Sequence, residues 1–191
     1  PSEGKSLTAA NIAISYAMLG KKVLLIDADM RKPTQRRLWR VEKPTGLCDF
    51  LAKISKLELD KVKDLPLWIV CTGTIPPNPS ELLSSERMKH FVEESAKVYD
   101  YIIIDTPPIN TVADAQIVST YVDGVVLVVK SGDTTEDELN EAIDAVRRAG
   151  GNLCGTVLND LNMKSVKYAY KYKYGGKYGY KYSYSESYEA R

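Results

Sequence analysis

Residues 23–29 read Val23-Leu24-Leu25-Ile26-Asp27-Ala28-Asp29, a continuous apolar run that ends in two carboxylates. Runs without polar alternation are typical of strands buried on both faces, and such strands belong to parallel sheets covered by helices. Similar runs predict four more strands along the chain, at 67–71, 101–105, 124–130 and 153–158. We therefore expect a mostly parallel central sheet.

The segments between these runs have the 3.6-residue periodicity of helices, at 6–19, 80–98, 112–121 and 135–149. Gly20 and Gly150 stand where a helix commonly ends in a left-handed residue. Thr135 and Glu138 have the spacing of a capping box at a helix start. Strands that alternate with helices predict an α/β fold of three layers.

Gly4-Lys5-Ser6 directly precedes the first expected helix and matches the second half of a G-x-x-x-x-G-K-[ST] phosphate loop. Backbone N–H groups at a helix N-terminus favour a phosphate, and the helix dipole adds to that preference. Lys5 would supply a positive charge to the β- and γ-phosphates, and the Ser6 hydroxyl would ligate Mg²⁺. The tripeptide is weak evidence by itself, because it occurs often by chance.

Three carboxylates support this interpretation: Asp27 and Asp29 follow one expected strand, and Asp105 follows another. Ligands of an open parallel sheet collect beyond the carboxyl ends of its strands, so these residues should converge on the phosphate loop. A single aspartate at a strand end more often caps the following turn. Two strand ends together with Gly4-Lys5-Ser6 favour a Mg²⁺-nucleotide site and a P-loop NTPase-like fold.

Several longer motifs resemble those of the bacterial tyrosine kinases, the P-loop kinases of capsular and exopolysaccharide synthesis. The resemblance extends over essentially the whole chain, and the motifs occur in the family's order. The matching stretches are residues 1–6, Pro-Ser-Glu-Gly-Lys-Ser; 23–33, ending in Asp-Ala-Asp-Met-Arg-Lys-Pro; 73–83, Gly-Thr-Ile-Pro-Pro-Asn-Pro-Ser-Glu-Leu-Leu; 101–108, Tyr-Ile-Ile-Ile-Asp-Thr-Pro-Pro; and the tyrosine-rich C-terminus.

The resemblance implies ATP and Mg²⁺ as cofactors and a role for each matched position. Asp27 would lie near the metal and act as a base for the tyrosine hydroxyl, and Asp105 would hold the metal through water. The implied catalytic residues are Lys5, Asp27, Asp29 and Asp105. The implied metal ligands are Ser6, Asp27 and Asp105. The implied nucleotide contacts are Glu3, Gly4, Lys5, Ser6, Leu7 and, at the adenine, Asn159. Arg31 belongs to the motif without an assigned role.

The chain also departs from the family pattern. Leu7 stands where the family usually has threonine, which matters little because Ser6 carries the metal-facing hydroxyl. The strand that feeds the phosphate loop, the first half of that loop and the upstream helical segment used for ring assembly are not in the sequence. We expect a piece of a longer protein that lacks a central strand and binds ATP weakly by itself.

The C-terminal residues 164–191 differ in composition from the predicted kinase domain at 1–163. Six lysines and one arginine oppose two glutamates there, which makes a net charge of +5 on a chain of net charge +1. A segment with so few aliphatic residues cannot offset its ordering entropy, so we expect it to be disordered. Its nine tyrosines are the expected phosphoacceptors: Tyr168, Tyr170, Tyr172, Tyr174, Tyr178, Tyr180, Tyr182, Tyr184 and Tyr188.

Three functions are compatible with this arrangement. The first is an autophosphorylating protein-tyrosine kinase that regulates polysaccharide synthesis. The second is a non-kinase ATPase switch of the division-site or partition type; those ATPases use a Lys-Gly-Gly-x-Gly-Lys loop, and here Pro1 and Ser2 occupy the two glycine positions. The third is a module whose basic aromatic tail binds single-stranded nucleic acid or anionic lipid. Only the composition of the tail supports this third function. We expect the kinase and no nucleic-acid partner.

The resemblance also implies partners and a place in the cell. It implies a homo-oligomeric ring, tail phosphorylation between subunits, and a membrane protein that activates the kinase. The kinase would then lie in the cytoplasm at the inner face of the membrane; no apolar run is long enough to span it. Three cysteines, Cys48, Cys71 and Cys154, lack metal or redox spacing, and we expect buried free thiols.

Overall fold

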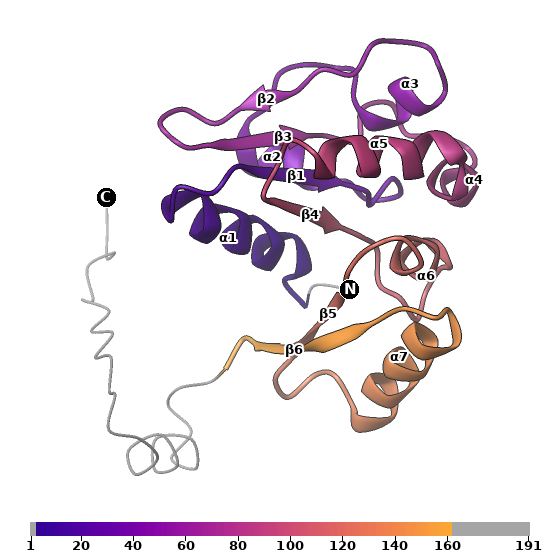
Figure 1. Ribbon diagram of the computed structural model, residues 1–191. Coiled ribbons are helices and arrows are strands. Elements are labelled where there is room, and N and C mark those ends of the chain that lie inside the picture. The colour runs from indigo at the N-terminus through magenta and orange to yellow at the C-terminus, as the bar shows by residue number, and fades with distance from the viewer. Residues whose placement is uncertain (1–2, 162–191) are drawn as a thin grey trace, which may run out of the picture. The chain divides into compact units, whose positions relative to one another are not determined.

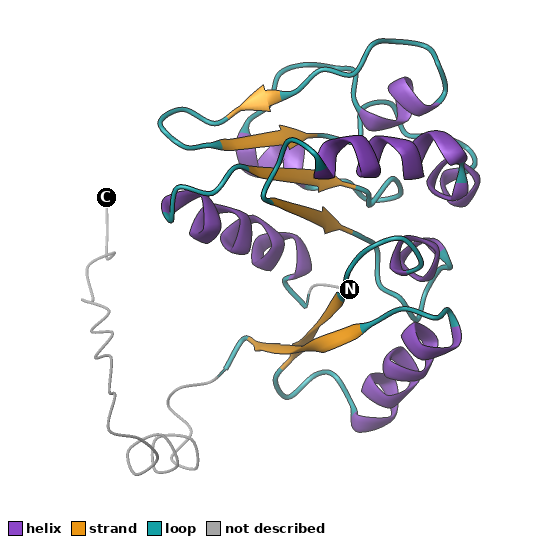
Figure 2. Ribbon diagram, in the orientation of Figure 1, coloured by secondary structure: helices purple, strands orange, loops and turns teal. Residues whose placement is uncertain are grey.

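The computed structural model describes residues 3–161, which alternate between helices and strands (Figures 1 and 2). The helices are α1 (Lys5–Met18), α2 (Gln35–Trp39), α3 (Leu47–Leu51), α4 (Pro79–Ser84), α5 (Glu86–Ala96), α6 (Asp114–Ser119) and α7 (Glu136–Arg148). The strands are β1 (Val23–Asp27), β2 (Asp60–Lys61), β3 (Leu67–Val70), β4 (Tyr101–Asp105), β5 (Val125–Lys130) and β6 (Leu153–Asn159). The predicted boundary at 163/164 and the predicted disordered tail lie outside these residues.

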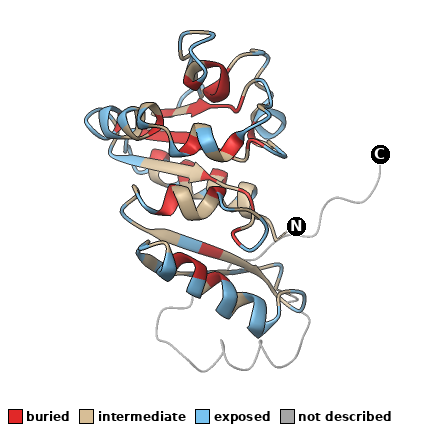
Figure 3. Ribbon diagram, turned by 90° about the vertical axis from the view of Figure 1, so that its right-hand side faces the viewer, coloured by how far each residue is buried: buried red, intermediate tan, exposed pale blue. Residues whose placement is uncertain are grey.

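Strand β1 is the centre of a four-stranded sheet with the order β2-β3-β1-β4. Its pairings with β3 and with β4 are both parallel, and β2 adds an antiparallel edge. All five residues of β1 are buried, as the unbroken apolar run predicted. The buried residues of this sheet gather in β1 and β3, and β4 is mostly of intermediate exposure (Figure 3).

Side chains that alternate along β1 enter two separate hydrophobic cores. Leu24 and Ile26 pack on one face with Met88 of α5. Val23 and Leu25 pack on the other face with the small residues Ala10, Ala13 and Ala17 of α1. The sheet is therefore covered by helices on both faces, and the three-layer α/β prediction is confirmed.

Strands β5 and β6 form a second, two-stranded parallel sheet that packs against α7. Within residues 3–161, β4 pairs only with β1, and β5 pairs only with β6. One edge of β4 and one edge of β5 therefore have no neighbouring strand in the described part of the chain. In Figure 1 these two strands lie at the junction between the sheets.

Local structure differs from the sequence-based expectation in several places. The helix expected at 80–98 is two helices, because Ser85 is extended (φ −65°, ψ 146°) and its hydroxyl caps α5 by accepting from the Met88 N–H. Helix α6 is shorter than the expected 112–121, and α2, α3 and β2 were not predicted. The capping box of Thr135 and Glu138 is confirmed at the start of α7.

The expectation that all three cysteine thiols are buried is wrong for one of them. Cys48 and Cys71 are buried, but Cys154 is exposed. Exposure alternates along β6, and only the face that includes Leu153 packs towards α7. Among residues 3–161, no helix is long and apolar enough to cross a membrane.

Candidate nucleotide and metal site

The phosphate loop leads into α1 through Gly4, whose φ of 87° lies in the left-handed region. Glycine adopts this conformation without the Cβ clash of other residues. A Cβ atom at Gly4 would also collide with the side-chain amide of Asn159. The Asn159 Nδ2 group donates to the Glu3 carbonyl at 2.8 Å, so the end of β6 holds the start of the loop. Asn159 therefore lies beside the loop, and the adenine contact expected of it stays a prediction.

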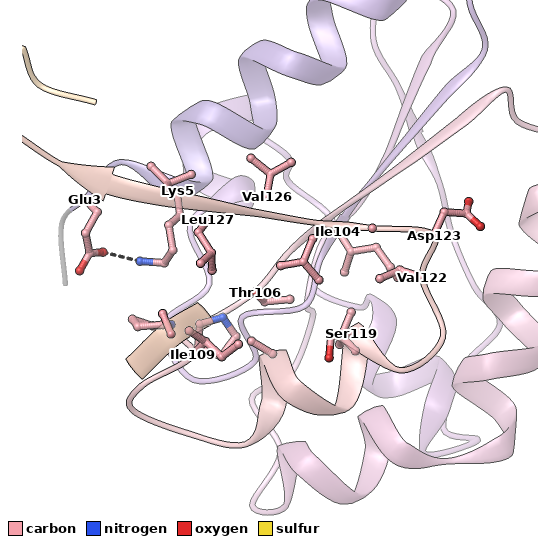
Figure 4. Close-up of a pocket in the computed structure, with 18 of the residues that line it drawn as sticks. Glu3, Lys5, Ile104, Thr106, Ile109, Ser119, Val122, Asp123, Val126 and Leu127 are labelled. Carbon is pink, nitrogen blue, oxygen red and sulfur yellow. Dashed lines mark hydrogen bonds and ion pairs between the residues drawn. The ribbon is translucent and has the colours of Figure 1, made fainter. Parts of the chain in front are cut away.

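Lys5 forms an ion pair with Glu3, with 2.6 Å between Nζ and Oε2 (Figure 4). Partial burial acts to raise the pKa of Glu3, but the hydrogen bond from Lys5 lowers it to about 2. The carboxylate is therefore charged at neutral pH, and it keeps the lysine at the loop. An incoming triphosphate would have to compete with Glu3 for this ammonium group.

Asp27 and Asp105 lie side by side as register partners at the carboxyl ends of β1 and β4. Both are buried, with relative exposures of 0% and 3%. Buried carboxylates are costly unless they are paired, hydrogen-bonded or bound to a metal. The predicted convergence of the two strand-end carboxylates is present in the structure.

Among residues 3–161, hydrogen-bond donors reach only one oxygen of the Asp27 carboxylate. Its Oδ2 accepts from the backbone N–H groups of Thr34 at 3.1 Å and Gln35 at 2.9 Å. Its Oδ1 is buried and has no hydrogen-bond partner among the described residues. Burial raises the pKa of Asp27 to about 7 despite the hydrogen bond from Gln35, and the nearby charges of Asp105 and Asp29 act in the same direction as burial.

The carboxylate of Asp105 is linked to the phosphate loop through Gln35. The Gln35 Nε2 group donates to Asp105 Oδ2 at 2.8 Å and to the Ser6 carbonyl at 2.9 Å. Burial raises the pKa of Asp105, and hydrogen bonds from Gln35 and Ser6 partly offset that effect. Ser6, Asp27 and Asp105 are thus brought together, as the sequence predicted.

Asp29 shapes the turn that follows β1. Its Oδ1 accepts from the backbone N–H groups of Arg31 at 3.2 Å and Lys32 at 2.9 Å. The side chain of Arg31 leaves this turn in the direction of α6. There its Nε and Nη2 groups donate to the two carboxylate oxygens of Asp114, at 2.8 and 3.2 Å.

Asp114 is fully buried and has a second donor, the Ser80 hydroxyl, at 2.5 Å. Burial acts to raise the pKa of Asp114, but the hydrogen bonds from Arg31 and Ser80 keep it below its ordinary value. The turn of Asp29 is therefore anchored to α6 and to the start of α4. This anchor supplies the structural role that the sequence left open for Arg31.

These residues fit a magnesium ion that is shared with a nucleotide. Mg²⁺ commonly takes one or two carboxylates, several waters and substrate phosphates rather than a cage of protein ligands. Residues 3–161 contain no group of three or more His, Cys, Asp or Glu side chains that could hold a metal by themselves. The buried, unpaired Oδ1 of Asp27 is the atom that a bound ion or its water would satisfy.

A cavity of about 980 Å³ opens between β4 and β5, and it reaches Glu3 and Lys5 (Figure 4). Its walls include Ile104, Val126 and Leu127, and neither Asp27 nor Asp105 lines it. Lys5 is the one cation among the described residues that line it, and its other charged groups are carboxylates, so the rest of the cavity suits a triphosphate poorly. The phosphate loop and the strand-end carboxylates beside it remain the candidate nucleotide site.

The remaining predicted site residues have simpler outcomes. Leu7 lies on the first turn of α1 and is 54% exposed, so it plays no part in the core. The nine predicted phosphoacceptor tyrosines lie outside the described residues. The sequence missed Gln35 and Asp114, because their partners are 70 and 83 residues away along the chain. Only the position of Gln35 shortly after a motif could have drawn attention to it.

Comparison with known proteins agrees with this geometry. The AAA domain family matches residues 3–152 of the chain. Tyrosine-protein kinase YwqD of Bacillus subtilis is 44% identical over 173 residues, which cover 89% of this chain and 73% of that protein. The solved kinase domain of Escherichia coli tyrosine kinase ETK superposes with a TM-score of 0.83 at 31% identity, covering 96% of this chain and 69% of that one.

A more distant likeness concerns the fold alone. The septum site-determining protein MinD of Pyrococcus horikoshii, solved with Mg-ADP, has a TM-score of 0.69 at 20% identity. That match covers 83% of this chain and 65% of the MinD chain. The three-layer arrangement is therefore common to kinases and to division ATPases.

Proposed function

This chain belongs to the bacterial tyrosine-protein kinases, whose AAA domain it carries, and from this membership we propose that it phosphorylates its own C-terminal tyrosines with ATP. The observation that carries the proposal is the convergence of Asp27 and Asp105 on Ser6 beside the Lys5 ammonium group. Phosphoryl transfer depends mainly on positioning and on charge stabilisation, which such a set of residues supplies. The phosphorylation would regulate capsular or exopolysaccharide synthesis.

Lys5 and the start of α1 bind the phosphates in this proposal. The ammonium group exchanges Glu3 for the β- and γ-phosphate oxygens, and the N–H groups of the first helical turn point at the same oxygens. Ser6, Asp27 and Asp105 would hold Mg²⁺, Asp105 through water, and Asn159 would contact the adenine. The ion, when bound, neutralises charge that develops on the transferred group.

Asp27 is the proposed base for the tyrosine hydroxyl. A general base works best when its pKa lies near the working pH. Burial raises the pKa of Asp27 to about 7 in the metal-free protein, and a bound Mg²⁺ would lower it. Asp29, held at the turn, completes the acidic set around the reacting hydroxyl.

The tail chemistry supports a product-release step. Residues 164–191 carry a net charge of +5, which draws them towards ATP and the clustered carboxylates. Each phosphotyrosine adds about −1.5 to −2 charges, so about three modifications cancel the charge of the tail. Further modification makes the tail anionic, and the acidic site then repels it.

Partners and location belong to the same proposal. We expect a ring of identical subunits in which the tail of one enters the site of the next. We also expect a membrane protein that activates the kinase and holds it at the inner face of the cell membrane.

Phosphopeptide mapping after incubation with Mg-ATP and the activator tests the proposal. We expect label on the tail tyrosines, and loss of that label in Lys5→Met and in Asp27→Asn. ATP hydrolysis without phosphotyrosine would instead identify an ATPase switch of the MinD kind.

A mixing experiment tests transfer between subunits. A Lys5→Met chain that retains its tail is combined with an active chain that lacks residues 164–191. Label on the inactive chain is the expected result, and an unlabelled tail would show that transfer occurs within one subunit.

A further inference from the structure

Gln35, the first residue of α2, is a fully buried polar side chain with a hydrogen bond on every polar atom. Its Nε2 group uses both hydrogens, one to the Ser6 carbonyl and one to Asp105 Oδ2. Its Oε1 accepts from the Trp39 Nε1 group at 3.0 Å. Its backbone N–H donates to Asp27 Oδ2. One residue therefore contacts the phosphate-loop helix and both strand-end carboxylates.

The orientation of this amide follows from the chemistry of its neighbours. The indole of Trp39 is only a donor, and the backbone carbonyl of Ser6 is only an acceptor. A flipped amide would place two donors face to face at Trp39 and two acceptors face to face at the Ser6 carbonyl. Because Gln35 and Trp39 are four residues apart on one helix, their side chains lie on the same face. Trp39 thus keeps the Nε2 group of Gln35 directed at Asp105.

We propose that Gln35 is a positioning residue that sets the distance and orientation between Asp27 and Asp105, with Trp39 as its orienting partner. This inference rests on the proposed nucleotide site, which it deepens. The Nε2 group lies between two acceptors, Asp105 Oδ2 and the Ser6 carbonyl, and donates to both. Without this donor, the two acceptors would face each other with no hydrogen between them. The carboxylates would then turn away from the positions that a metal shared with the nucleotide requires.

Gln35→Met tests the donor, since methionine has a similar length and no hydrogen-bonding group of comparable strength. The readout is the dissociation constant of ADP, measured with Mg²⁺ and again with EDTA. We expect ADP with Mg²⁺ to bind about 10–100-fold more weakly, the usual cost of losing an outer-shell partner of a metal site. ADP in EDTA should change less than about threefold, because Lys5 and the start of α1 remain.

Trp39→Phe tests the orientation and serves if the first variant does not fold. It keeps an aromatic ring but removes the N–H, so the Gln35 amide becomes free to rotate. The expected loss is intermediate, about 3–10-fold for ADP with Mg²⁺. Trp68→Phe is the matched control, because it makes the same chemical change on β3, where the indole packs against Tyr99. That control should bind ADP within twofold of the wild type.

The control also provides a spectroscopic signature, since the sequence has two tryptophans and Trp68→Phe leaves Trp39 alone. Adding Mg-ADP to this variant should change the Trp39 fluorescence. The change should be lost when Gln35→Met is added, because the link between the indole and the site is then broken.

The outcomes separate this inference from the kinase proposal. Equal Mg²⁺-dependent affinities in wild type, Gln35→Met and Trp39→Phe overturn the positioning role, even when the wild type forms phosphotyrosine. A selective loss of Mg-ADP affinity supports the role, even when no phosphotyrosine forms and the kinase proposal fails. Equal loss with Mg²⁺ and with EDTA identifies a general structural role and also overturns it.

Discussion

Asp27 and Asp105 are register partners on adjacent parallel strands, and one carboxylate oxygen of each accepts a hydrogen bond from Gln35. The glutamine uses its backbone N–H for one aspartate and its side chain for the other. Two buried carboxylates on adjacent strands repel each other when both are charged, so their arrangement depends on the donors that surround them.

The metal-free protein should be less stable at pH 8 than at pH 5. The pKa of Asp27 is about 7 in the folded protein, above its ordinary value of 3.8. The stability associated with the protonated group is therefore present below about pH 4 and is lost as the pH rises towards 7. This loss amounts to about 4 kcal/mol at most.

Thermal unfolding in EDTA measures the effect. Asp27→Asn, which mimics the neutral carboxyl group, should match the wild type below about pH 4, and the margin by which its unfolding temperature exceeds that of the wild type should grow from pH 5 to pH 8. Asp123→Asn removes the same charge from an exposed position and serves as the control. Identical pH profiles for wild type and Asp27→Asn would contradict the burial of an ionisable group at this strand end.

Gly4→Ala should impair nucleotide binding more than the same change elsewhere. Both Gly4 (φ 87°) and Gly132 (φ 77°) lie in the left-handed region, so alanine costs about 1–2 kcal/mol at either position. A Cβ atom at Gly132 meets nothing within 4 Å, whereas at Gly4 it meets Asn159. Gly132→Ala should therefore bind ADP like the wild type, and Gly4→Ala should lose at least tenfold in affinity. Comparable affinities in the two variants would refute the close approach of Asn159.

Arg31→Ala should destabilise the fold because it leaves the buried carboxylate of Asp114 with Ser80 as its remaining side-chain donor. Removing one partner of a buried ion pair is costly, and we expect a loss of about 2 kcal/mol, since the arginine itself is 40% exposed. Urea unfolding at pH 7 measures the free energy of unfolding. Arg37→Ala, at an exposed position of α2, is the control and should change it by less than about 0.5 kcal/mol.

A double variant gives the sharper test. In Arg31→Ala combined with Asp114→Leu, no buried charge is left without its partner, so part of the lost stability should return. If the double variant is less stable than the sum of the single changes predicts, the Arg31–Asp114 pair does not anchor the turn of Asp29.

Thiol labelling should distinguish Cys154 from the other two cysteines. Burial raises the pKa of both Cys48 and Cys71 to about 12, so little thiolate is present at pH 8. Cys154 is exposed. A disulfide reagent should modify one thiol within seconds to minutes and the others only on unfolding, and Cys154→Ser should abolish the rapid phase. Rapid reaction of two or three thiols would contradict the burial of Cys48 and Cys71.

The motifs and the main elements could be predicted from local patterns. The apolar run at 23–27 is a buried parallel strand, and Thr135 and Glu138 form the capping box of α7. These features depend on residues close together in the sequence. The same reasoning failed for Cys154, because an apolar run does not reveal which face of a strand a helix will cover.

Sequence patterning determined that strand-end aspartates would meet a phosphate loop, since parallel strands present their carboxyl ends at one edge. Tertiary structure alone decided what holds them there: Gln35 spans to Asp105, and Arg31 spans to Asp114, over 70 and 83 residues. Such contacts depend on strand register and helix placement, which are set by the packing of the whole core. No local periodicity encodes these contacts. The residues around Gln35 or Arg31 in the sequence do not determine where β4 or α6 will lie.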